Sequence, residues 1–458
     1  MRESSAPRIF AATYTRSTAS SRRTTTPCTC FTSSKRITWI RSSTTSTSRR
    51  VRTSTPTRTI SRSGTRDRTS RAVTNRKSEA EDQKMTKILK RSPHYGQHVA
   101  HGAKGFFDFA GWEMPETFTS MEDEVKACRS AAVLFDGHQM GEIHLKGPDA
   151  QDAVQKVCAN NIKAEPGRCF YSSLLNEDGG IVDDLVVLCL APDHYLLTAA
   201  AFNVAKTPGW VRSHVSDMDV EIEDLTNGTT IIEIQGPKSR DILQKITDAD
   251  ISNEALPYFR FVETQIAGID CIVARLGVTG ELGYEIIYDP GYAYTMYDAI
   301  LEAGKDDGLQ LCGSKTVGTF RLEKVYHIYT RDIDENTNPF EAGLDKSVKL
   351  DKGDFIGRDA LLRIKQQGVS RKLVGFEITD GSAAATPGTP IEINGQECGK
   401  ATFAGFSPTL DKTIGIGYVP TEHAEVGTEL VIKTEPESLK ATVVETPFFD
   451  PKGDRIRV

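Results

Sequence analysis

The sequence predicts an α+β protein in which two related strand–helix–hairpin halves precede a small C-terminal β-barrel domain. Three observations support this fold class. A repeat with fixed internal spacing indicates a duplication, the chain from about residue 372 onward changes to short alternating strands, and residues 1–84 have a composition unlike the rest. At about 100 to 200 residues per domain, the part after residue 84 is long enough to bury cores of its own.

Residues 1–84 form a leader that we expect to be disordered. They contain 19 Lys and Arg but only 5 Asp and Glu, and their Ser and Thr runs show no apolar periodicity. An Arg-rich, Ser-rich and acid-poor composition is typical of an organelle transit peptide and predicts a mitochondrial protein. The alternative is that the true start is Met85 and the protein is cytoplasmic. Because aromatic residues are nearly absent, the leader does not favour a nucleic-acid tail.

The duplication lies within a predicted domain at residues 85–365. The segments 143–157 and 232–246 share an apolar strand pattern, a Gly-Pro pair and an amphipathic helix at the same spacing. Proline at the first helical position and apolar residues at helical spacing predict a strand and then a helix in each copy. A hairpin is predicted after each helix, at about residues 184–200 and 271–288.

Both predicted hairpins carry a glycine-marked acidic segment. These are Gly179-Gly180-Ile181-Val182-Asp183-Asp184 and Thr279-Gly280-Glu281-Leu282-Gly283-Tyr284-Glu285. Glycine permits close backbone approach, so a carboxylate beside it can be aimed at a ligand. The plainer interpretation of either segment alone is an acidic turn. Because the hairpins are equivalent, we expect Asp184 and Glu285 on opposite sides of one ligand cleft.

The remaining elements follow in order. Residues 293–304 and 317–324 predict helices, and residues 353–361 predict a turn that enters a helix. A second domain is predicted at residues 366–458. Its short strands near 372–377, 391–393, 399–404, 414–419, 428–433 and 439–444 are separated by Pro, Gly, Asn and Asp turns, which is typical of a β-barrel. We expect this barrel to close over the cleft.

Composition and motifs exclude several classes of protein. The chain has no Gly-x-Gly-x-x-Gly after a strand, no phosphate-binding loop and no His-Glu-x-x-His, which argues against nucleotide and zinc-protease chemistry. His94, His98 and His101 favour a polar helix face over a metal site. Nine scattered cysteines indicate free thiols in a reducing compartment, and no run of 18 apolar residues predicts a membrane span. An acidic balance after residue 84 argues against nucleic acid as partner.

Seven motifs occur in an order found in a known family. They are Phe109-Ala110-Gly111-Trp112-Glu113-Met114-Pro115, Leu134-Phe135-Asp136 with Met140-Gly141-Glu142-Ile143, Gly179 to Asp184, Gln235-Gly236-Pro237, Thr279 to Glu285, Arg321-Leu322-Glu323 and Glu341-Ala342-Gly343-Leu344. Over about residues 90–445 the chain resembles the glycine cleavage T-protein, the aminomethyltransferase. Residues 321–352 are also similar to the folate domain of dimethylglycine and sarcosine dehydrogenases, whose FAD domain this chain lacks.

The resemblance implies a three-lobed core with tetrahydrofolate at its centre. It places Asp184 near the folate nitrogens that receive the one-carbon unit, as a positioned general base. It places Glu285 on the pterin, whose adjacent N–H donors a carboxylate accepts in parallel. Tyr195, Met140 and Leu197 match positions that line the folate pocket. The implied partner is the lipoyl-carrying H-protein of the glycine cleavage system.

Three departures from the family pattern leave the one-carbon donor open. The family's Asp-Val-Ser-His-Met becomes Asp136-Gly137-His138-Gln139-Met140, an Asn becomes Ala199 and a pocket Arg becomes Val317. The resemblance predicts a tetrahydrofolate-dependent aminomethyltransferase. One alternative is a folate-dependent demethylase acting on a small methylated donor, since loss of an arginine is compatible with a cationic donor. Another is a non-catalytic folate-binding protein.

Overall fold

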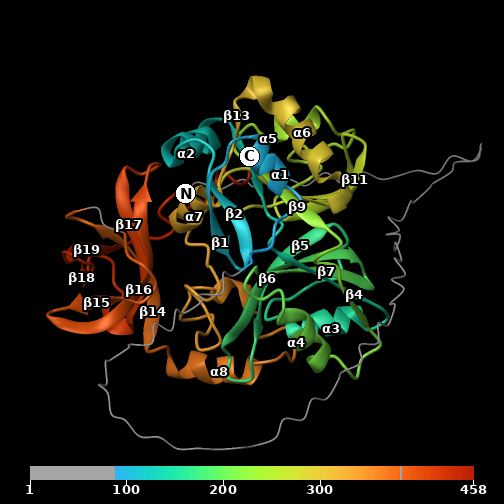
Figure 1. Ribbon diagram of the computed structural model, residues 1–458. Coiled ribbons are helices and arrows are strands. Elements are labelled where there is room, and N and C mark those ends of the chain that lie inside the picture. The colour runs from blue at the N-terminus through green and yellow to red at the C-terminus, as the bar shows by residue number, and fades with distance from the viewer. Residues whose placement is uncertain (1–87, 382–383) are drawn as a thin grey trace, which may run out of the picture. The chain divides into compact units, whose positions relative to one another are not determined.

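A computed structural model describes residues 88–381 and 384–458. The leader predicted at residues 1–84 lies outside the described residues, so its disorder stays a prediction. The described chain forms a two-stranded sheet, an 11-stranded sheet and a closed six-stranded barrel. Figure 1 shows these parts in chain order from blue to red.

The 11-stranded sheet carries the duplication. Its strand order is β13-β3-β9-β12-β11-β10-β5-β6-β7-β4-β8. The strands are β3 (Ala132–Asp136), β4 (Gly141–Lys146), β5 (Arg168–Leu175), β6 (Ile181–Ala191), β7 (His194–Ala199), β8 (Glu221–Asp224), β9 (Thr230–Gln235), β10 (Arg260–Ile266), β11 (Ile269–Arg275), β12 (Gly283–Tyr288) and β13 (Leu309–Leu311).

The order of these strands confirms the two halves. In the first half the sheet runs β5-β6-β7-β4, and in the second it runs β10-β11-β12-β9, so corresponding strands take corresponding places. The halves join where β5 pairs with β10 through Arg168 and Arg260. A helix follows the first strand of each half, α3 (Ala150–Val157) and α5 (Ser239–Gln244).

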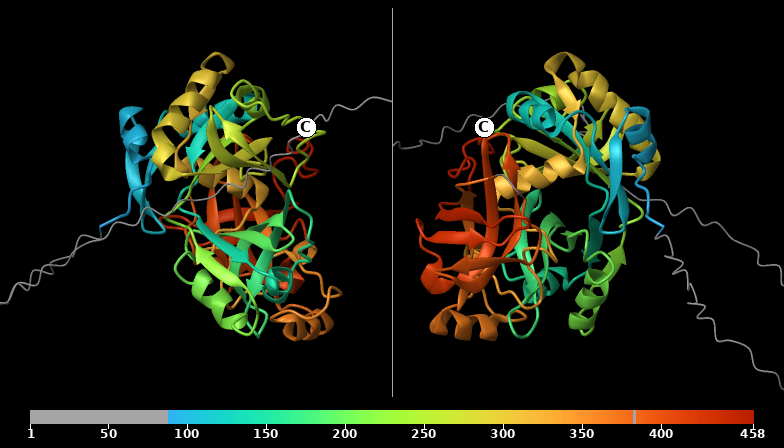
Figure 2. Two further views of the ribbon diagram at one scale, coloured as in Figure 1. Left: turned by 90° about the vertical axis from the view of Figure 1, so that its right-hand side faces the viewer. Right: turned by 60° about the vertical axis from the view of Figure 1, so that its left-hand side comes forward.

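Helices cover the outer face of each half. The other helices are α1 (Tyr95–Ala100), α2 (Met121–Ser130), α4 (Thr207–His214), α6 (Ala293–Gly304), α7 (Ser314–Lys324) and α8 (Arg358–Gln367). Val154 of α3 and Val211 of α4 belong to the core cluster of the first half, while Ile242 of α5 and Met296 of α6 belong to that of the second. In both views of Figure 2 these helices lie outside the strands.

The inner faces of the two halves meet in one apolar layer. Leu188 and Leu196 of the first half share a cluster with Ile231, Ile272 and Ile287 of the second. Side chains alternate between the two faces of a strand. The residues that flank these positions two places away therefore also face the space between the halves. We call this side the inner face.

The C-terminal barrel has the six strands that the turn spacing predicts. They are β14 (Arg371–Ile378), β15 (Thr389–Ile393), β16 (Gln396–Ser407), β17 (Lys412–Pro420), β18 (Glu429–Ile432) and β19 (Leu439–Val444). Helix α7 anchors the barrel, since Arg321 pairs with Asp332 at 2.5 Å and Thr402 of β16 donates to the same carboxylate at 2.5 Å. The predicted boundary after residue 365 falls inside α8.

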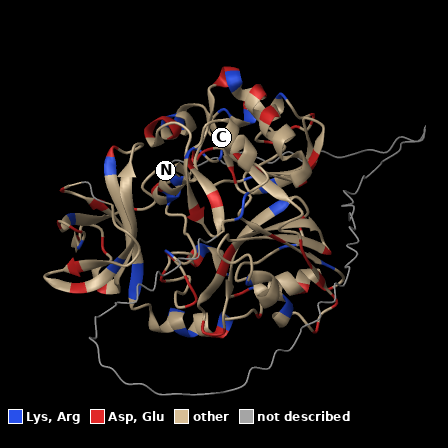
Figure 3. Ribbon diagram, in the orientation of Figure 1, with Lys and Arg blue, Asp and Glu red and all other residues tan. Residues whose placement is uncertain are grey.

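An N-terminal hairpin and helix complete the described chain. The hairpin strands are β1 (Lys104–Phe109) and β2 (Trp112–Thr117). Basic and acidic residues are intermixed over both halves and the barrel (Figure 3). The electrostatic environment of each site described below is therefore determined by its individual neighbouring residues. No helix in residues 88–381 and 384–458 has the length and hydropathy needed to cross a membrane.

Candidate active site

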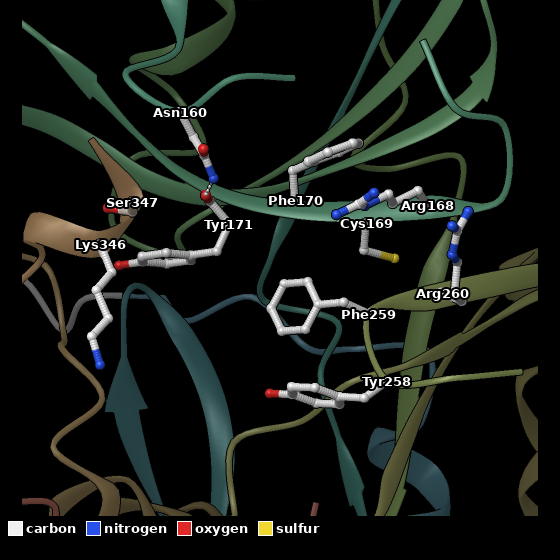
Figure 4. A pocket seen from close by; sticks show the side chains of 10 residues that line it. All are labelled: Asn160, Arg168, Cys169, Phe170, Tyr171, Tyr258, Phe259, Arg260, Lys346 and Ser347. Atoms are coloured by element: carbon white, nitrogen blue, oxygen red, sulfur yellow. Dashed lines mark hydrogen bonds between the residues drawn. The ribbon is translucent and has the colours of Figure 1, made fainter. Parts of the chain in front are cut away.

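A pocket of about 500 Å³ opens where the two halves join. Figure 4 shows its lining from β5, from the start of β10 and the two residues before it, and from the short 3-10 helix Asp345–Ser347. The lining residues are Asn160, Arg168, Cys169, Phe170, Tyr171, Tyr258, Phe259, Arg260, Lys346 and Ser347. None of them belongs to the barrel, so closure of the barrel over a ligand cleft stays a prediction. The barrel packs on α7, where Leu322 lies against Ile414 and Ile416.

Asp184 borders this pocket through Tyr171. It lies on β6 on the same face as Val186 and Leu188, since residues two apart on a strand share a face. Its side chain is therefore on the inner face. The Tyr171 hydroxyl donates to Asp184 Oδ2 at 3.1 Å. Burial, followed by repulsion from Asp183, raises the pKa of Asp184 to about 7. A carboxyl group that titrates near neutral pH beside a pocket suits proton transfer.

Asp183 points to the opposite face and is held by the protein itself. Its carboxylate accepts from Asn203 Nδ2 at 2.8 Å, from Thr207 Oγ1 at 2.6 Å and from the backbone N–H of Ala200 at 3.3 Å. The alternation that separates Asp183 from Asp184 is therefore confirmed. The first aspartate ties β6 to the start of α4, and the second is left for the pocket.

The glycines before these aspartates serve the packing of the hairpin. A Cβ on Gly180 would lie 1.8 Å from the carbonyl oxygen of Glu335. The Ile181 N–H also donates to the carbonyl of Thr337 at 2.9 Å. Close backbone approach is thus required here, as predicted, but the partner is a loop of the same chain.

Glu285 lies on the inner face of the second half. It occupies β12 in alternation with Ile287, opposite Glu233 of β9. Burial raises the pKa of Glu285 to about 7. Burial and then the charge of Glu285 raise the pKa of Cys169, which lines the pocket. Asp184 and Glu285 thus come from different halves, and each acts on a residue that lines this pocket, Tyr171 and Cys169 respectively. Their role in binding a ligand stays a prediction.

Their positions in the duplication differ from the expectation. Asp184 lies on β6, whose counterpart in the second half is β11, whereas Glu285 lies on β12, the counterpart of β7. The two hairpins are equivalent, but the two carboxylates are not on equivalent strands. The prediction that the two carboxylates fall on equivalent elements is therefore wrong at the level of single strands. The repeat determines the order of the strands but not which strand carries the acid.

The three predicted lining residues separate into two groups. Met140 packs against the inner cluster and is partly exposed, which is consistent with a place beside a ligand. Tyr195 and Leu197 are fully buried in the outer core against α3, and the Tyr195 hydroxyl bonds to Gln151 of that helix. The structure contradicts a lining role for these two, since alternation along β7 puts Leu196 on the inner face instead.

Glu281, the first glutamate of the second acidic segment, forms a buried ion-pair cluster. Arg129 Nη1 lies 3.0 Å from Glu281 Oε1, and Arg455 Nε donates to both carboxylate oxygens at 2.8 Å. Arg129 also pairs with Glu323, which accepts from Ser407 of the barrel at 2.6 Å. This segment thus joins the second half, α7, the barrel and the C-terminal residues.

Sequence reasoning missed Tyr171 and Glu233. Tyr171 begins a Tyr-Ser-Ser run in an ordinary strand, and only the pairing of β5 with β6 brings its hydroxyl to Asp184. Glu233 stands within the apolar run Ile231-Ile232-Glu233-Ile234, and a lone acid in a buried strand was the available signal. His94 and His98, which the sequence places on a polar helix face, instead contact the buried Asp136. His94 Nδ1 lies 3.1 Å from Asp136 Oδ1, and His98 Nε2 lies 3.4 Å from Asp136 Oδ2.

Comparisons with known proteins place this two-part fold in one class. Residues 94–352 match the GCVT N-terminal domain, and residues 371–450 match the glycine cleavage T-protein C-terminal barrel domain. The chain belongs to the glycine cleavage T-protein family.

The similarity extends over almost the full length of the relatives. The aminomethyltransferase of Halothermothrix orenii is 40% identical over 362 residues, covering 79% of this chain and 100% of the relative. That of Thermotoga maritima is 38% identical over 363 residues, covering 79% and 98%. The crystal structure of glycine cleavage system aminomethyltransferase T from Bartonella henselae matches with a TM-score of 0.73 and 30% identity, covering 79% and 99%.

Proposed function

We propose that this protein is the tetrahydrofolate-dependent aminomethyltransferase of a glycine cleavage system. Its similarity to aminomethyltransferases over almost their whole length supports an enzyme of this type. In the proposed reaction the carbon–sulfur bond of an aminomethylated lipoyl group breaks and the carbon bonds to the folate nitrogens. The amine leaves as ammonia, the lipoyl thiol is freed, and methylenetetrahydrofolate is the product.

The observation that carries this proposal is that Asp184 and Glu285 lie on the inner face beside one pocket. Asp184 accepts from Tyr171 and the charge of Glu285 acts on Cys169, and both of these residues line the pocket. Asp184 takes the role of the group that receives a proton from the attacking folate amine, with Tyr171 fixing its carboxylate at 3.1 Å. Glu285 accepts hydrogen bonds from the pterin, and each charge-assisted bond contributes about 1.5 to 3 kcal/mol. The pocket of about 500 Å³ falls within the range of small-molecule sites.

The experiment is a comparison of two aspartates in the same hairpin. Asp184→Asn removes the proton acceptor and keeps the shape, so turnover should fall about 100-fold to 10,000-fold with an unchanged melting temperature. Asp178→Asn is the matched control, because Asp178 lies in the exposed turn before β6. Near-normal turnover of Asp184→Asn would remove its catalytic role.

The partner and the compartment follow from the same proposal. A lipoyl-carrying H-protein would deliver the donor, because a lipoyl arm must be brought by a carrier. The composition of residues 1–84 supports import into mitochondria, and a start at Met85 would instead give a cytoplasmic protein.

A second candidate is a folate-dependent demethylase, favoured by the replacement of a family arginine by Val317. Val317 stands at the position of a family arginine and packs in an apolar cluster with Phe135, the cross-strand neighbour of Glu233. The inner face here presents carboxylates, and a cationic methylated donor would be attracted to them. Formation of methyltetrahydrofolate from a small donor would support this candidate.

A further inference from the structure

Glu233 and Glu285 form a carboxyl pair on neighbouring strands. They are directly opposed in the register of β9 and β12, where opposed side chains lie on the same face about 4.5 to 5.5 Å apart at Cβ. Glu233 is 6% exposed. Within the described ranges, no Lys, Arg or His forms an ion pair with either residue. Like charges this close cannot both ionise freely, so the pair retains a proton.

The surrounding hydrogen bonds decide which oxygen of Glu233 is free. Gln235 Oε1 accepts from the N–H groups of Val278 and Thr279 at 3.1 and 3.0 Å and from Thr279 Oγ1 at 2.6 Å. These donors fix the orientation of the amide, so Gln235 Nε2 donates to Glu233 Oε2 at 2.6 Å. Glu233 Oε1 makes no hydrogen bond in the described part of the chain and is the oxygen that can carry the proton.

Gly137 makes room for that free oxygen. A Cβ at this position would lie 2.9 Å from Glu233 Oε1 and 3.0 Å from Ile231 Cγ2. Such contacts are too close for any larger residue unless Glu233 moves. The departure at Gly137 and the acid at Glu233 are therefore two parts of one local arrangement.

Glu142 is a second buried carboxyl group on the inner face with an oxygen that lacks a hydrogen-bond donor among the residues that the structure describes. It lies on β4 of the other half. Its neighbours Ile143 and Leu145 face the outer core, so Glu142 faces the opposite, inner side. It is 2% exposed, and its Oε2 has no hydrogen-bond partner among residues 88–381 and 384–458. Burial, with a smaller contribution from the charge of Glu285, raises the pKa of Glu142 to about 8.

We propose that Glu233 and Glu285 recognise the ligand ring as one acid–carboxylate pair, in which Glu233 donates from Oε1 and Glu285 accepts. This inference rests on the proposed function. The pterin of tetrahydrofolate presents a ring carbonyl beside an N–H and an amino group. Glu285 accepts from the two nitrogen donors, and the protonated Glu233 donates to the carbonyl. Glu233 thus provides a hydrogen-bond donor without a positive charge.

The pair gives binding a predictable pH dependence. Burial raises the pKa of both glutamates, and the charge of Glu285 raises that of Glu233 further. Binding needs one proton on the pair, so affinity is lost as pH rises and Glu233 ionises. The other titratable groups near the pair are Asp136, Glu142, Cys169 and Tyr258. All of them are acids that become negative when they ionise, so none replaces the proton that the pair loses.

The test is calorimetric titration of the full chain with tetrahydrofolate under anaerobic conditions between pH 6.5 and 9. The parent protein should lose at least about tenfold in affinity over this range, the effect of one charge-assisted bond. Glu233→Gln keeps a donor that cannot ionise, so its affinity should match the parent near pH 6.5 and stay constant. Glu221→Gln, at an exposed position on the edge strand β8, is the control and should behave as the parent.

Several outcomes would overturn the inference. If Glu233→Gln retains the pH dependence of the parent, or binds more than tenfold more weakly at pH 6.5 while folded, Glu233 is not the donor. Titration of the parent in two buffers of different ionisation enthalpy needs no variant: about one proton should be taken up on binding near pH 9, and zero uptake refutes the pair. A parent that does not bind tetrahydrofolate at any pH overturns the proposed function itself.

Discussion

The neighbouring aspartates of β6 should have opposite phenotypes, and Asp183→Ala tests this most sharply. The substitution leaves Thr207 Oγ1 and Asn203 Nδ2 without an acceptor, and both residues are buried. Each unsatisfied buried donor costs about 1 to 3 kcal/mol. Removing a buried carboxyl group recovers part of this loss, so we expect the free energy of unfolding to fall by about 3 kcal/mol.

Thermal unfolding of the ligand-free protein measures this effect. At about 2 to 4 °C per kcal/mol, the melting temperature should fall by about 6 to 12 °C. Asp183→Asn should cost less, because its amide oxygen still accepts from Asn203 and its amide nitrogen donates to Thr207 after the hydroxyl turns. A melting temperature of Asp183→Ala within 2 °C of the parent would refute the reasoning from these contacts.

The pH dependence of stability supplies an independent check on Asp183. Burial raises the pKa of Asp183 from 3.8 to about 6 in the folded protein. The folded state therefore binds its proton more tightly, and this stabilising contribution is present below about pH 4 and lost as pH rises through 6. Asp183→Asn lacks that loss, so its stability relative to the parent should improve from pH 4 to 7. A constant difference would contradict the assignment.

Three further predictions concern the boundary, the pocket and the ion pairs. A protein that begins at Met85 should be soluble and bind folate as well as the full chain, and aggregation would place the boundary elsewhere. Glu285→Ala should weaken tetrahydrofolate binding at least about tenfold by calorimetry, and an unchanged dissociation constant would contradict its role. Arg455→Ala should lower the unfolding free energy by about 1 to 2 kcal/mol, because Glu281 is then held by Arg129 alone; an unshifted melting curve would show that the pair is dispensable.

Local signals in the sequence were sufficient for most of the fold. The six barrel strands are bounded by Pro, Gly, Asn and Asp turns, and each observed strand overlaps its predicted segment. The duplication was visible because Gly147-Pro148 and Gly236-Pro237 each separate a strand from a helix at the same spacing. Each of these features is formed by residues that are close in the sequence, so it can be predicted from one short segment.

The site depends on contacts between segments that are far apart in the sequence, and local sequence patterns do not predict these contacts. Alternation separates Asp183 from Asp184, but nothing local shows which face meets the other half. The family resemblance places Tyr195 in the pocket, but its side chain lies in the outer core. The approach of Glu233 to Gly137 likewise requires the pairing of β3 with β9, and the two residues are 96 positions apart.

The most direct test of the central claim is to identify the product and the donor together. Purified protein is incubated with tetrahydrofolate and either an aminomethylated lipoyl carrier or a small methylated donor, and ammonia and folate products are measured. We predict ammonia and methylenetetrahydrofolate from the carrier, with both lost in Asp184→Asn. Methyltetrahydrofolate from the small donor, with no ammonia from the carrier, would contradict the account.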